Sequence, residues 1–137
     1  MNRYVLDTCA MIALLQEEQG ADKVAAALNA ANNGEASIVM HKLNLLEVYY
    51  DAYRWRGKEQ ADLMLFEVKK RPIKIIAEIT DEVFSKAGQL KASYKISLAD
   101  SIALAQAAAY DGELLTADHH EFDQMDGREN IRFLWIR

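Results

Sequence analysis

The sequence predicts an α/β fold, a three-layer α/β/α sandwich built around a mainly parallel five-stranded sheet. Short apolar runs alternate along the chain with longer stretches of helical periodicity, which is the order of elements in α/β proteins. The runs are apolar throughout, as strands buried on both faces of a parallel sheet are. Apolar residues make up 51% of the 137 residues and no linker is evident, so we expect a single domain over residues 1–137.

Each element of this sandwich can be placed. The predicted strands are Arg3–Leu6, Ala36–Met40, Ile73–Ile76, Glu113–Thr116 and Ile131–Leu134. The predicted helices are Thr8–Leu15, Ala21–Ala31, Lys42–Arg56, Lys58–Lys70, Asp81–Ala92 and Leu98–Tyr110. Pro72 and the turn Asp111-Gly112 are expected to stop two of these helices. Ser97, followed three residues later by Asp100, matches a capping box at the start of the last one.

The helix over residues 42–56 carries an apolar face and an acid on the same side. The apolar residues at three- and four-residue spacing are Leu43, Leu46, Tyr50 and Tyr53, which predicts that this face packs on the core. Glu47 falls on that side, and a glutamate is rarely buried without a partner. We expect either a salt bridge or a role as a ligand for Glu47, with Asn44 one turn earlier holding a water or a phosphate oxygen.

Four acids stand at positions where a functional site is expected. Asp7 ends the first strand, Asp118 follows the strand that ends at Thr116, and Glu47 and Asp100 lie early in helices. Ligands of α/β sheets gather beyond the carboxyl ends of the strands. Carboxylates brought together there repel each other, by up to about 4 kcal/mol for a close pair at an effective dielectric of about 20. A divalent cation would reverse the sign of that energy, and such a site indicates phosphate chemistry.

Each acid also has a purely structural explanation. Asp7 is a favoured N-cap residue, Asp100 belongs to the capping box, and Asp118 suits a plain turn. Their joint fit to strand ends and helix starts is what favours a metal site over four unrelated caps and turns.

The sequence resembles the PIN-domain ribonucleases, and among them the VapC-type toxins of toxin–antitoxin pairs. The resemblance covers the whole chain. The matching segments, in order, are Val5-Leu6-Asp7-Thr8, Asn44-Leu45-Leu46-Glu47, Ser97-Leu98-Ala99-Asp100-Ser101-Ile102-Ala103-Leu104-Ala105 and Leu114-Leu115-Thr116-Ala117-Asp118, with Phe122 after the last. Cys9 departs from the pattern, because a small polar residue is common there, and Phe122 follows Asp118 at a slightly longer interval than in many members.

The resemblance implies a fold, an activity and partners. Asp7, Glu47, Asp100 and Asp118 match the acidic quartet that binds one or two Mg²⁺ or Mn²⁺ ions at the end of a parallel five-stranded sheet. Thr8 and Thr116 match supporting hydroxyl positions, and Asn44 is expected to support the site as well. Members of the family are endonucleases that cut single-stranded RNA, and VapC-type members form homodimers and are inhibited by a cognate antitoxin protein.

The expected mechanism is metal-assisted hydrolysis of RNA. A carboxylate-only quartet suits Mg²⁺ better than zinc, and a metal-held water can become the nucleophile. We expect Asp7 and Asp100 to bind the ion directly and Asp118 to bind it directly or through water. Glu47 would bind a second ion or orient the attacking water. The expected products are a 5′-phosphate and a 3′-hydroxyl.

Composition narrows the function further. The net charge of −5 argues against broad binding to phosphate backbones, although the basic clusters Arg54–Lys58 and Lys69–Lys74 either guide RNA or are solvated helix ends. The single cysteine excludes an intramolecular disulfide. No signal peptide and no apolar stretch of the roughly 20 residues needed to span a bilayer is seen, so we expect a cytoplasmic protein without a membrane partner.

Two other functions stay open at this point. One is an aspartate-nucleophile phosphatase, which also opens with a strand followed by Asp7-Thr8 but needs a second aspartate where Cys9 stands. The other is a degenerate PIN domain that only binds RNA or a protein. Cys9 itself is either a nucleophile near a helix N-terminus or a buried, inert thiol, and the absence of a predicted histidine nearby favours the second reading.

Overall fold

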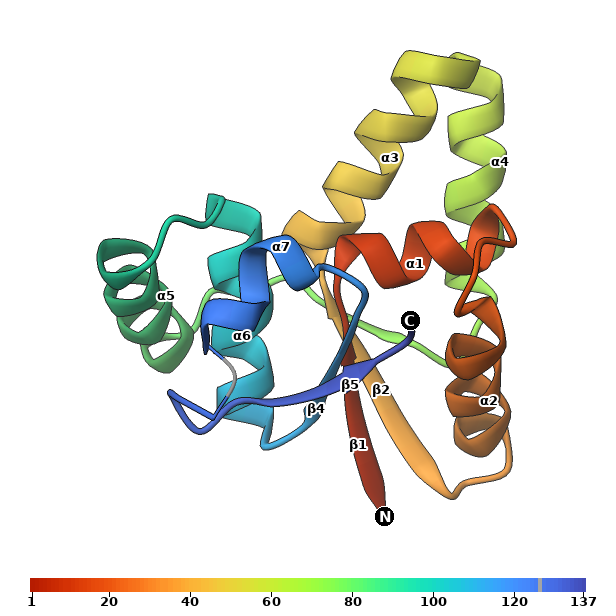
Figure 1. Ribbon diagram of the computed structural model, residues 1–137. Helices are drawn as coiled ribbons and strands as arrows, with labels where there is room; N and C mark the ends of the chain where they lie inside the picture. Colours follow the sequence, from red (N-terminus) through yellow and green to blue (C-terminus); the bar gives the residue numbers. More distant parts are fainter. Residues whose placement is uncertain (126) are drawn as a thin grey trace.

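Five strands form one sheet, in the order β3-β2-β1-β4-β5, and every pairing is parallel (Figure 1). The computed structural model describes residues 1–125 and 127–137. The strands are β1 (Asn2–Leu6), β2 (Ala36–His41), β3 (Lys74–Ile76), β4 (Glu113–Thr116) and β5 (Arg132–Trp135). The predicted parallel sheet is confirmed, with β5 one residue later than expected.

The helices follow the predicted order closely. They are α1 (Thr8–Leu15), α2 (Ala21–Asn32), α3 (Lys42–Arg56), α4 (Lys58–Lys69), α5 (Asp81–Ser93), α6 (Leu98–Tyr110) and the short α7 (His119–Phe122). The capping interaction at Ser97 is present, since its hydroxyl accepts a hydrogen bond from the Asp100 N–H at 3.1 Å. Asp111 ends α6 in the left-handed conformation, with φ +53°, as the predicted turn requires.

The sheet is covered on both faces, which confirms the three-layer architecture. Successive residues of each central strand enter opposite cores: Leu6 packs with residues of α1 to α4, whereas Val5 packs with residues of α5 to α7. Leu115 and Leu114 of β4 divide in the same way. In Figure 1 the two groups of helices lie on opposite sides of the strands. A continuous apolar run is therefore what a strand in this position needs.

The predicted core face of α3 is wrong. Leu46, Tyr50 and Tyr53 are 57%, 57% and 47% exposed, and the buried face is made by Asn44, Leu45 and Val48. Both faces satisfy helical spacing. The choice between them depends on how α3 crosses α1, α4 and α6, which its own periodicity does not encode. The consequence is an exposed apolar face on the helix that carries Glu47.

The start of α3 is fixed by a buried histidine. Nδ1 of His41 accepts a hydrogen bond from the Leu43 N–H at 3.1 Å, and its Nε2 lies 3.0 Å from the Glu78 carbonyl oxygen. The first contact makes Nδ1 an acceptor, so Nε2 carries the proton and donates to Glu78. His41 thus joins the end of β2 and the first turn of α3 to the segment after β3.

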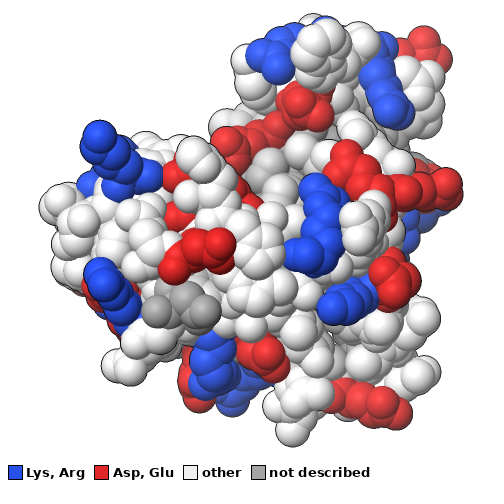
Figure 2. All heavy atoms as spheres, in the orientation of Figure 1, with Lys and Arg blue, Asp and Glu red and all other residues white. Residues whose placement is uncertain are grey.

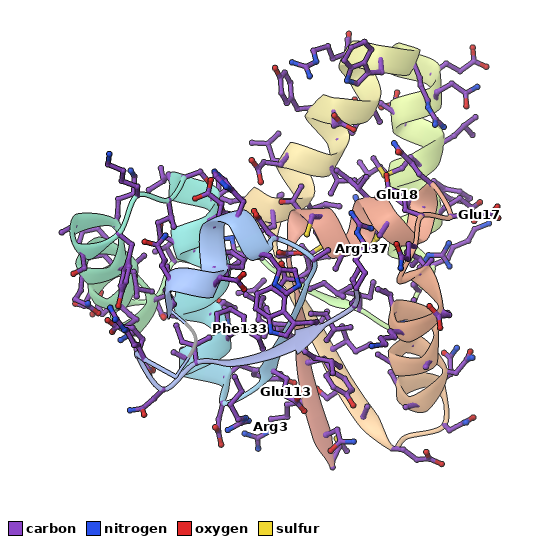
Figure 3. All side chains as sticks on the ribbon, viewed as in Figure 1. Arg3, Glu17, Glu18, Glu113, Phe133 and Arg137 are labelled. Carbon is purple, nitrogen blue, oxygen red and sulfur yellow. The ribbon has the colours of Figure 1, made fainter. Side chains whose placement is uncertain are left out.

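The final residues are tied to the loop between α1 and α2. Nη1 of Arg137 donates to the Gln19 carbonyl at 2.8 Å and to a Glu18 carboxylate oxygen at 3.3 Å, and Figure 3 shows the Arg137 side chain near Glu18. Gly20 makes this approach possible: its φ is +97°, and an added Cβ would lie 2.5 Å from the Ile136 carbonyl oxygen. Within the described residues, no helix has the length and apolar character to cross a membrane.

Candidate metal centre

Asp7 is held at the junction of β1 and α1. It is 3% exposed, and its Oδ1 caps α1 by accepting the Ala10 N–H at 2.8 Å. Burial raises the pKa of Asp7 to about 6, partly offset by hydrogen bonds from Thr116 and Ala10. Capping therefore uses only one of the two carboxylate oxygens, so the structural and functional explanations of Asp7 are compatible.

Asp118 reaches the same region from the neighbouring strand. β1 and β4 pair in parallel with Leu6 opposite Leu115, so the residues that follow both strands emerge at one edge of the sheet. The Asp118 N–H donates to Thr116 Oγ1 at 3.0 Å, and Asp118 Oδ1 accepts the Glu121 N–H at 3.1 Å. Thr116 is fully buried, and its hydroxyl holds the turn that presents Asp118.

Glu47 is bound to α1 through a threonine. The Thr8 hydroxyl donates to Glu47 Oε1 at 2.6 Å. Asn44, 0% exposed, donates through Nδ2 to the Ala99 carbonyl at 3.1 Å and lies 3.5 Å from Thr8 Oγ1. Its Oδ1 is buried and has no hydrogen-bond partner among the described residues. Asn44 therefore links α3 to the start of α6, one residue before Asp100.

Asp100 stands in the first turn of α6, half-buried. Its pKa is raised to about 7, first by burial and then by the charges of Asp118, Asp7 and Glu47, while the hydrogen bond with Ser97 lowers it. The three other acids that the sequence singled out thus lie within electrostatic range of Asp100. Figure 2 shows acidic side chains around the place where the base of α3 approaches α6 and α7.

The donor chemistry suits a hard divalent ion, but the site is not preassembled. Carboxylate and hydroxyl oxygens, with no imidazole in the quartet, match the preference of Mg²⁺ and Mn²⁺. Over residues 1–125 and 127–137, however, no three His, Cys, Asp or Glu side chains lie close enough to hold an ion as they stand. An ion would have to draw these carboxylates together, and the raised pKa values of Asp7 and Asp100 reflect the burial and, after it, the charge repulsion that the ion would offset.

Cys9 is the residue whose place in the site the sequence did not reveal. It is half-buried rather than buried, and its Sγ contacts Asp7, Thr116 and the Ala117 N–H. Burial, followed by the Asp7 charge, raises the pKa of the Cys9 thiol to about 12, which agrees with an inert thiol and argues against an activated nucleophile. The one indication in the sequence is its position two residues after Asp7, which places Cys9 in the first turn of α1, next to the site.

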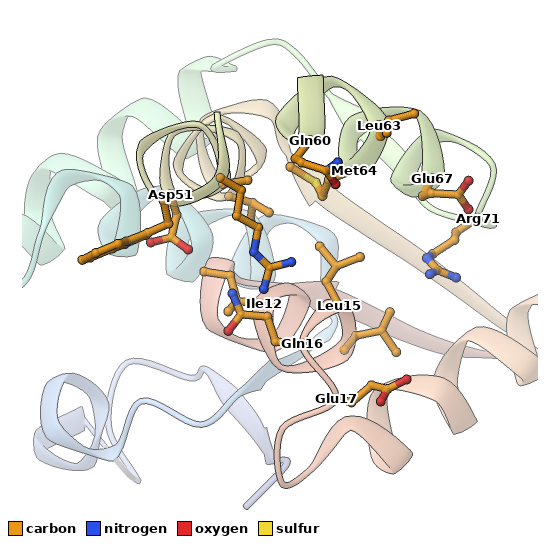
Figure 4. A pocket seen from close by; sticks show the side chains of 15 residues that line it. Ile12, Leu15, Gln16, Glu17, Asp51, Gln60, Leu63, Met64, Glu67 and Arg71 are labelled. Atoms are coloured by element: carbon orange, nitrogen blue, oxygen red, sulfur yellow. The ribbon is translucent and has the colours of Figure 1, made fainter. Parts of the chain in front are cut away.

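A separate groove lies between α1, α3 and α4. It encloses about 390 Å³, with Ile12, Leu15 and Met64 among its apolar residues and Glu17, Asp51, Glu67 and Arg71 among its charged ones (Figure 4). The Arg71 Nε is buried without a hydrogen-bond partner in the described part of the chain. The groove thus combines apolar side chains with charges of both signs.

Residues 4–128 match the sequence model of the PIN-domain family. The chain belongs to the PIN-domain family. No curated protein sequence matches it. Membership argues against the aspartate-nucleophile phosphatase, because the PIN-domain match includes the strand, Asp7 and Thr8 on which that alternative was based.

Solved structures share the fold of this PIN domain at low sequence identity. A chain of VapBC2 from Rickettsia felis, bound to a DNA fragment from their promoter, superposes with a TM-score of 0.76 at 19% identity over 97% of this chain and 98% of that chain. VapBC-1 from nontypeable Haemophilus influenzae superposes with a TM-score of 0.73 at 17% identity, over 98% of this chain and 98% of that chain. VapC20 from Mycobacterium tuberculosis, a sarcin-ricin loop cleaving toxin, superposes with a TM-score of 0.62 at 14% identity, over 94% of this chain and 98% of that chain.

Proposed function

We propose that this PIN domain is a Mg²⁺- or Mn²⁺-dependent endoribonuclease and the toxin of a type II toxin–antitoxin pair. The observation that carries the proposal is geometric. Asp7 and Asp118 follow the paired strands β1 and β4 at the carboxyl edge of a PIN sheet, Thr8 bonds Glu47 beside Asp7, and Asn44 bonds the Ala99 carbonyl next to Asp100. The likeness to VapBC chains and to a toxin that cleaves the sarcin-ricin loop supports it. With RNA as substrate, the protein would act in the cytoplasm.

The residues divide the proposed reaction between them. Asp7, Asp100 and Asp118 would hold the ion, which when bound supplies Lewis-acid polarisation of the phosphodiester and a more acidic water. Glu47, fixed by the Thr8 hydroxyl, orients the attacking water and accepts its proton. The water oxygen bonds to phosphorus as the bond from phosphorus to the 3′-oxygen breaks. The 3′-oxygen takes a proton from solvent, which leaves a 3′-hydroxyl and a 5′-phosphate.

Removal of one ligand charge tests the reaction. Asp7→Asn should abolish Mg²⁺-dependent cleavage of a panel of structured RNAs, while the far-UV circular dichroism stays unchanged. Asp111→Asn is the matched control, because Asp111 is an exposed carboxylate that pairs with Arg132 at the opposite end of α6, and it should cleave like the wild type. Cleavage by Asp7→Asn at the wild-type rate would refute the mechanism. Wild-type protein that binds these RNAs and never cuts them would favour the degenerate PIN domain.

An antitoxin segment would bind in the groove between α1, α3 and α4. Its apolar residues suit the apolar side chains of a peptide. The buried Nε of Arg71, which has no hydrogen-bond partner among the described residues, suits a carboxylate or carbonyl oxygen from that peptide. Arg71→Ala should weaken co-purification with the product of the adjacent reading frame, whereas Lys74→Ala, an exposed cation on β3, should not. If both variants retained the same amount of that product, the groove would not be the docking surface.

A second copy of the chain would cover the exposed face of α3. Leu46, Tyr50 and Leu98 border an almost wholly apolar hollow of about 410 Å³ that Glu47 also lines, so a homodimer would close the protein surface beside the acidic quartet. Leu46→Asp should convert a dimer to a monomer in light scattering after size exclusion. Phe84→Asp, which changes an apolar side chain of α5 that is 72% exposed, should leave the mass unchanged. A monomeric wild-type protein would contradict the dimer.

A further inference from the structure

The Cys9 thiol lies between the ends of the two central strands. Its Sγ is 3.5 Å from Asp7 Oδ2 and 3.5 Å from Thr116 Oγ1, and it accepts the Ala117 N–H at 3.2 Å. Asp7 follows β1, whereas Thr116 ends β4 and Ala117 begins the turn to Asp118. One side chain therefore contacts both segments that carry acids of the quartet.

The directions of these hydrogen bonds can be assigned. The Ala117 N–H can only donate, so sulfur accepts there. Thr116 Oγ1 already accepts the Asp118 N–H at 3.0 Å, and a carboxylate oxygen is the stronger acceptor for the single thiol proton. Cys9 thus donates to Asp7 Oδ2, while the Ala10 N–H binds Oδ1. With the hydrogen bond that Thr116 also gives to Asp7, these donors hold the carboxylate in one orientation.

We propose that Cys9 is a positioning residue of the metal centre: its thiol fixes the rotation of the Asp7 carboxylate and joins it to the turn that presents Asp118. The role rests on the proposed function, because it assumes that Asp7 and Asp118 bind the same ion. Groups that orient metal ligands without touching the metal commonly change metal affinity by about 10- to 100-fold when removed. Cys9 would act in this way and would not itself be a ligand.

Three variants separate hydrogen bonding from packing. Cys9→Ser keeps a donor and an acceptor, Cys9→Val keeps a comparable volume without either, and Cys9→Ala removes both volume and hydrogen bonds. Ser37→Ala is the matched control, because Ser37 is a half-buried residue whose hydroxyl bonds to Tyr110 at the other end of the sheet.

The primary readout is Mn²⁺ binding by calorimetry, with no RNA present. We expect Cys9→Val and Cys9→Ala to weaken binding by about tenfold or more, Cys9→Ser to stay close to wild type, and Ser37→Ala to have no effect. Wild-type affinity in both Cys9→Val and Cys9→Ala would overturn the positioning role. If Cys9→Ala proves unfolded by circular dichroism, the comparison of Cys9→Val with Cys9→Ser still decides the matter.

A thiophilic ion distinguishes a positioning residue from a ligand. Cd²⁺ bound by the carboxylates alone should give no sulfur-to-metal charge-transfer band in the ultraviolet, at wavelengths shorter than the aromatic bands. A band that appears in the wild type and is lost in Cys9→Ser would show direct ligation and overturn the proposal. Failure of the proposed function would give a different result: the wild-type protein would bind no Mn²⁺, and Asp7→Asn would not change the calorimetric signal. In that case the positioning role of Cys9 would be refuted as well.

Discussion

The Thr8 hydroxyl donates a 2.6 Å hydrogen bond to Oε1 of Glu47, so the first residue of α1 holds the acid of α3. Thr8→Val, which keeps the shape and removes the donor, should lower RNA cleavage by about 10- to 100-fold. Thr8→Ser keeps the hydroxyl and should restore most of it. The measurement is kcat/KM on one RNA at saturating Mg²⁺. Equal rates for Thr8→Val and the wild type would mean that Glu47 needs no such support.

The stability of the metal-free protein should fall as the pH rises from about 4 to about 7. The pKa of Asp7 is raised to about 6 and that of Asp100 to about 7, in both cases mainly by burial. At a pH between 3.8, the ordinary pKa of an aspartate, and these raised pKa values, the two carboxyl groups are deprotonated in the unfolded chain but still protonated in the folded chain. Folding is therefore favoured at low pH, and this contribution is lost by about pH 7; for Asp7 it amounts to about 3 kcal/mol.

Thermal melts across this pH range check the sign. Asp100→Asn should flatten the dependence, and Mn²⁺ should stabilise the protein more at about pH 8 than at about pH 5, because the ligands must be deprotonated. Metal-free stability that rises from about pH 4 to about pH 7 would contradict the assignment of raised carboxyl pKa values to this site.

Gly20→Ala should be among the most damaging small substitutions in the chain. It combines a φ of +97° with a Cβ 2.5 Å from the Ile136 carbonyl oxygen, and we expect a loss of about 3 kcal/mol or more. Gly34→Ala is the control: its φ is +76°, but nothing lies within 4 Å of the added Cβ, so only the backbone cost of about 1 kcal/mol should appear. Urea denaturation measures both, and similar losses would show that the steric contact relaxes freely.

His41→Ala should destabilise the protein by about 2 kcal/mol, at the upper end for a lost N-cap. It removes the cap of α3 and leaves the Glu78 carbonyl without its donor. Thr80→Ala is a suitable comparison, because Thr80 caps α5 through a single bond to the Val83 N–H and should cost about 1 kcal/mol. Denaturant melts that give the smaller loss for His41→Ala would mean that the bond to Glu78 contributes nothing.

The strands and the ends of most helices could be predicted because each is set by local residues. Leu114, Leu115 and Thr116 are apolar or β-branched and form β4 as predicted, and the Ser97 cap starts α6 where expected. The positions of Asp7 and Asp118 followed from parallel strands alone, since the carboxyl ends of such strands meet at one edge.

The rotation of α3 could not be predicted in the same way. Leu46 and Tyr50 carry the helical spacing of a core face and yet lie exposed, whereas Asn44, a polar residue, is fully buried. Asn44 is inside because its amide finds the Ala99 carbonyl, a contact between residues far apart in sequence. The contacts of Cys9 with Thr116 and Ala117 are of the same kind, so periodicity did not reveal them.

The pairing of β1 with β4 also sets when the acidic quartet can first exist during translation. Asp7 leaves the ribosome first of the four acids, whereas Asp118, which follows the neighbouring strand β4, is synthesised after Glu47 and Asp100. A nascent chain that stops before β4 has neither the strand that completes the edge nor Asp118. Domains fold as units during synthesis. The complete acidic quartet can therefore form only after β4 and Asp118 have emerged from the ribosome.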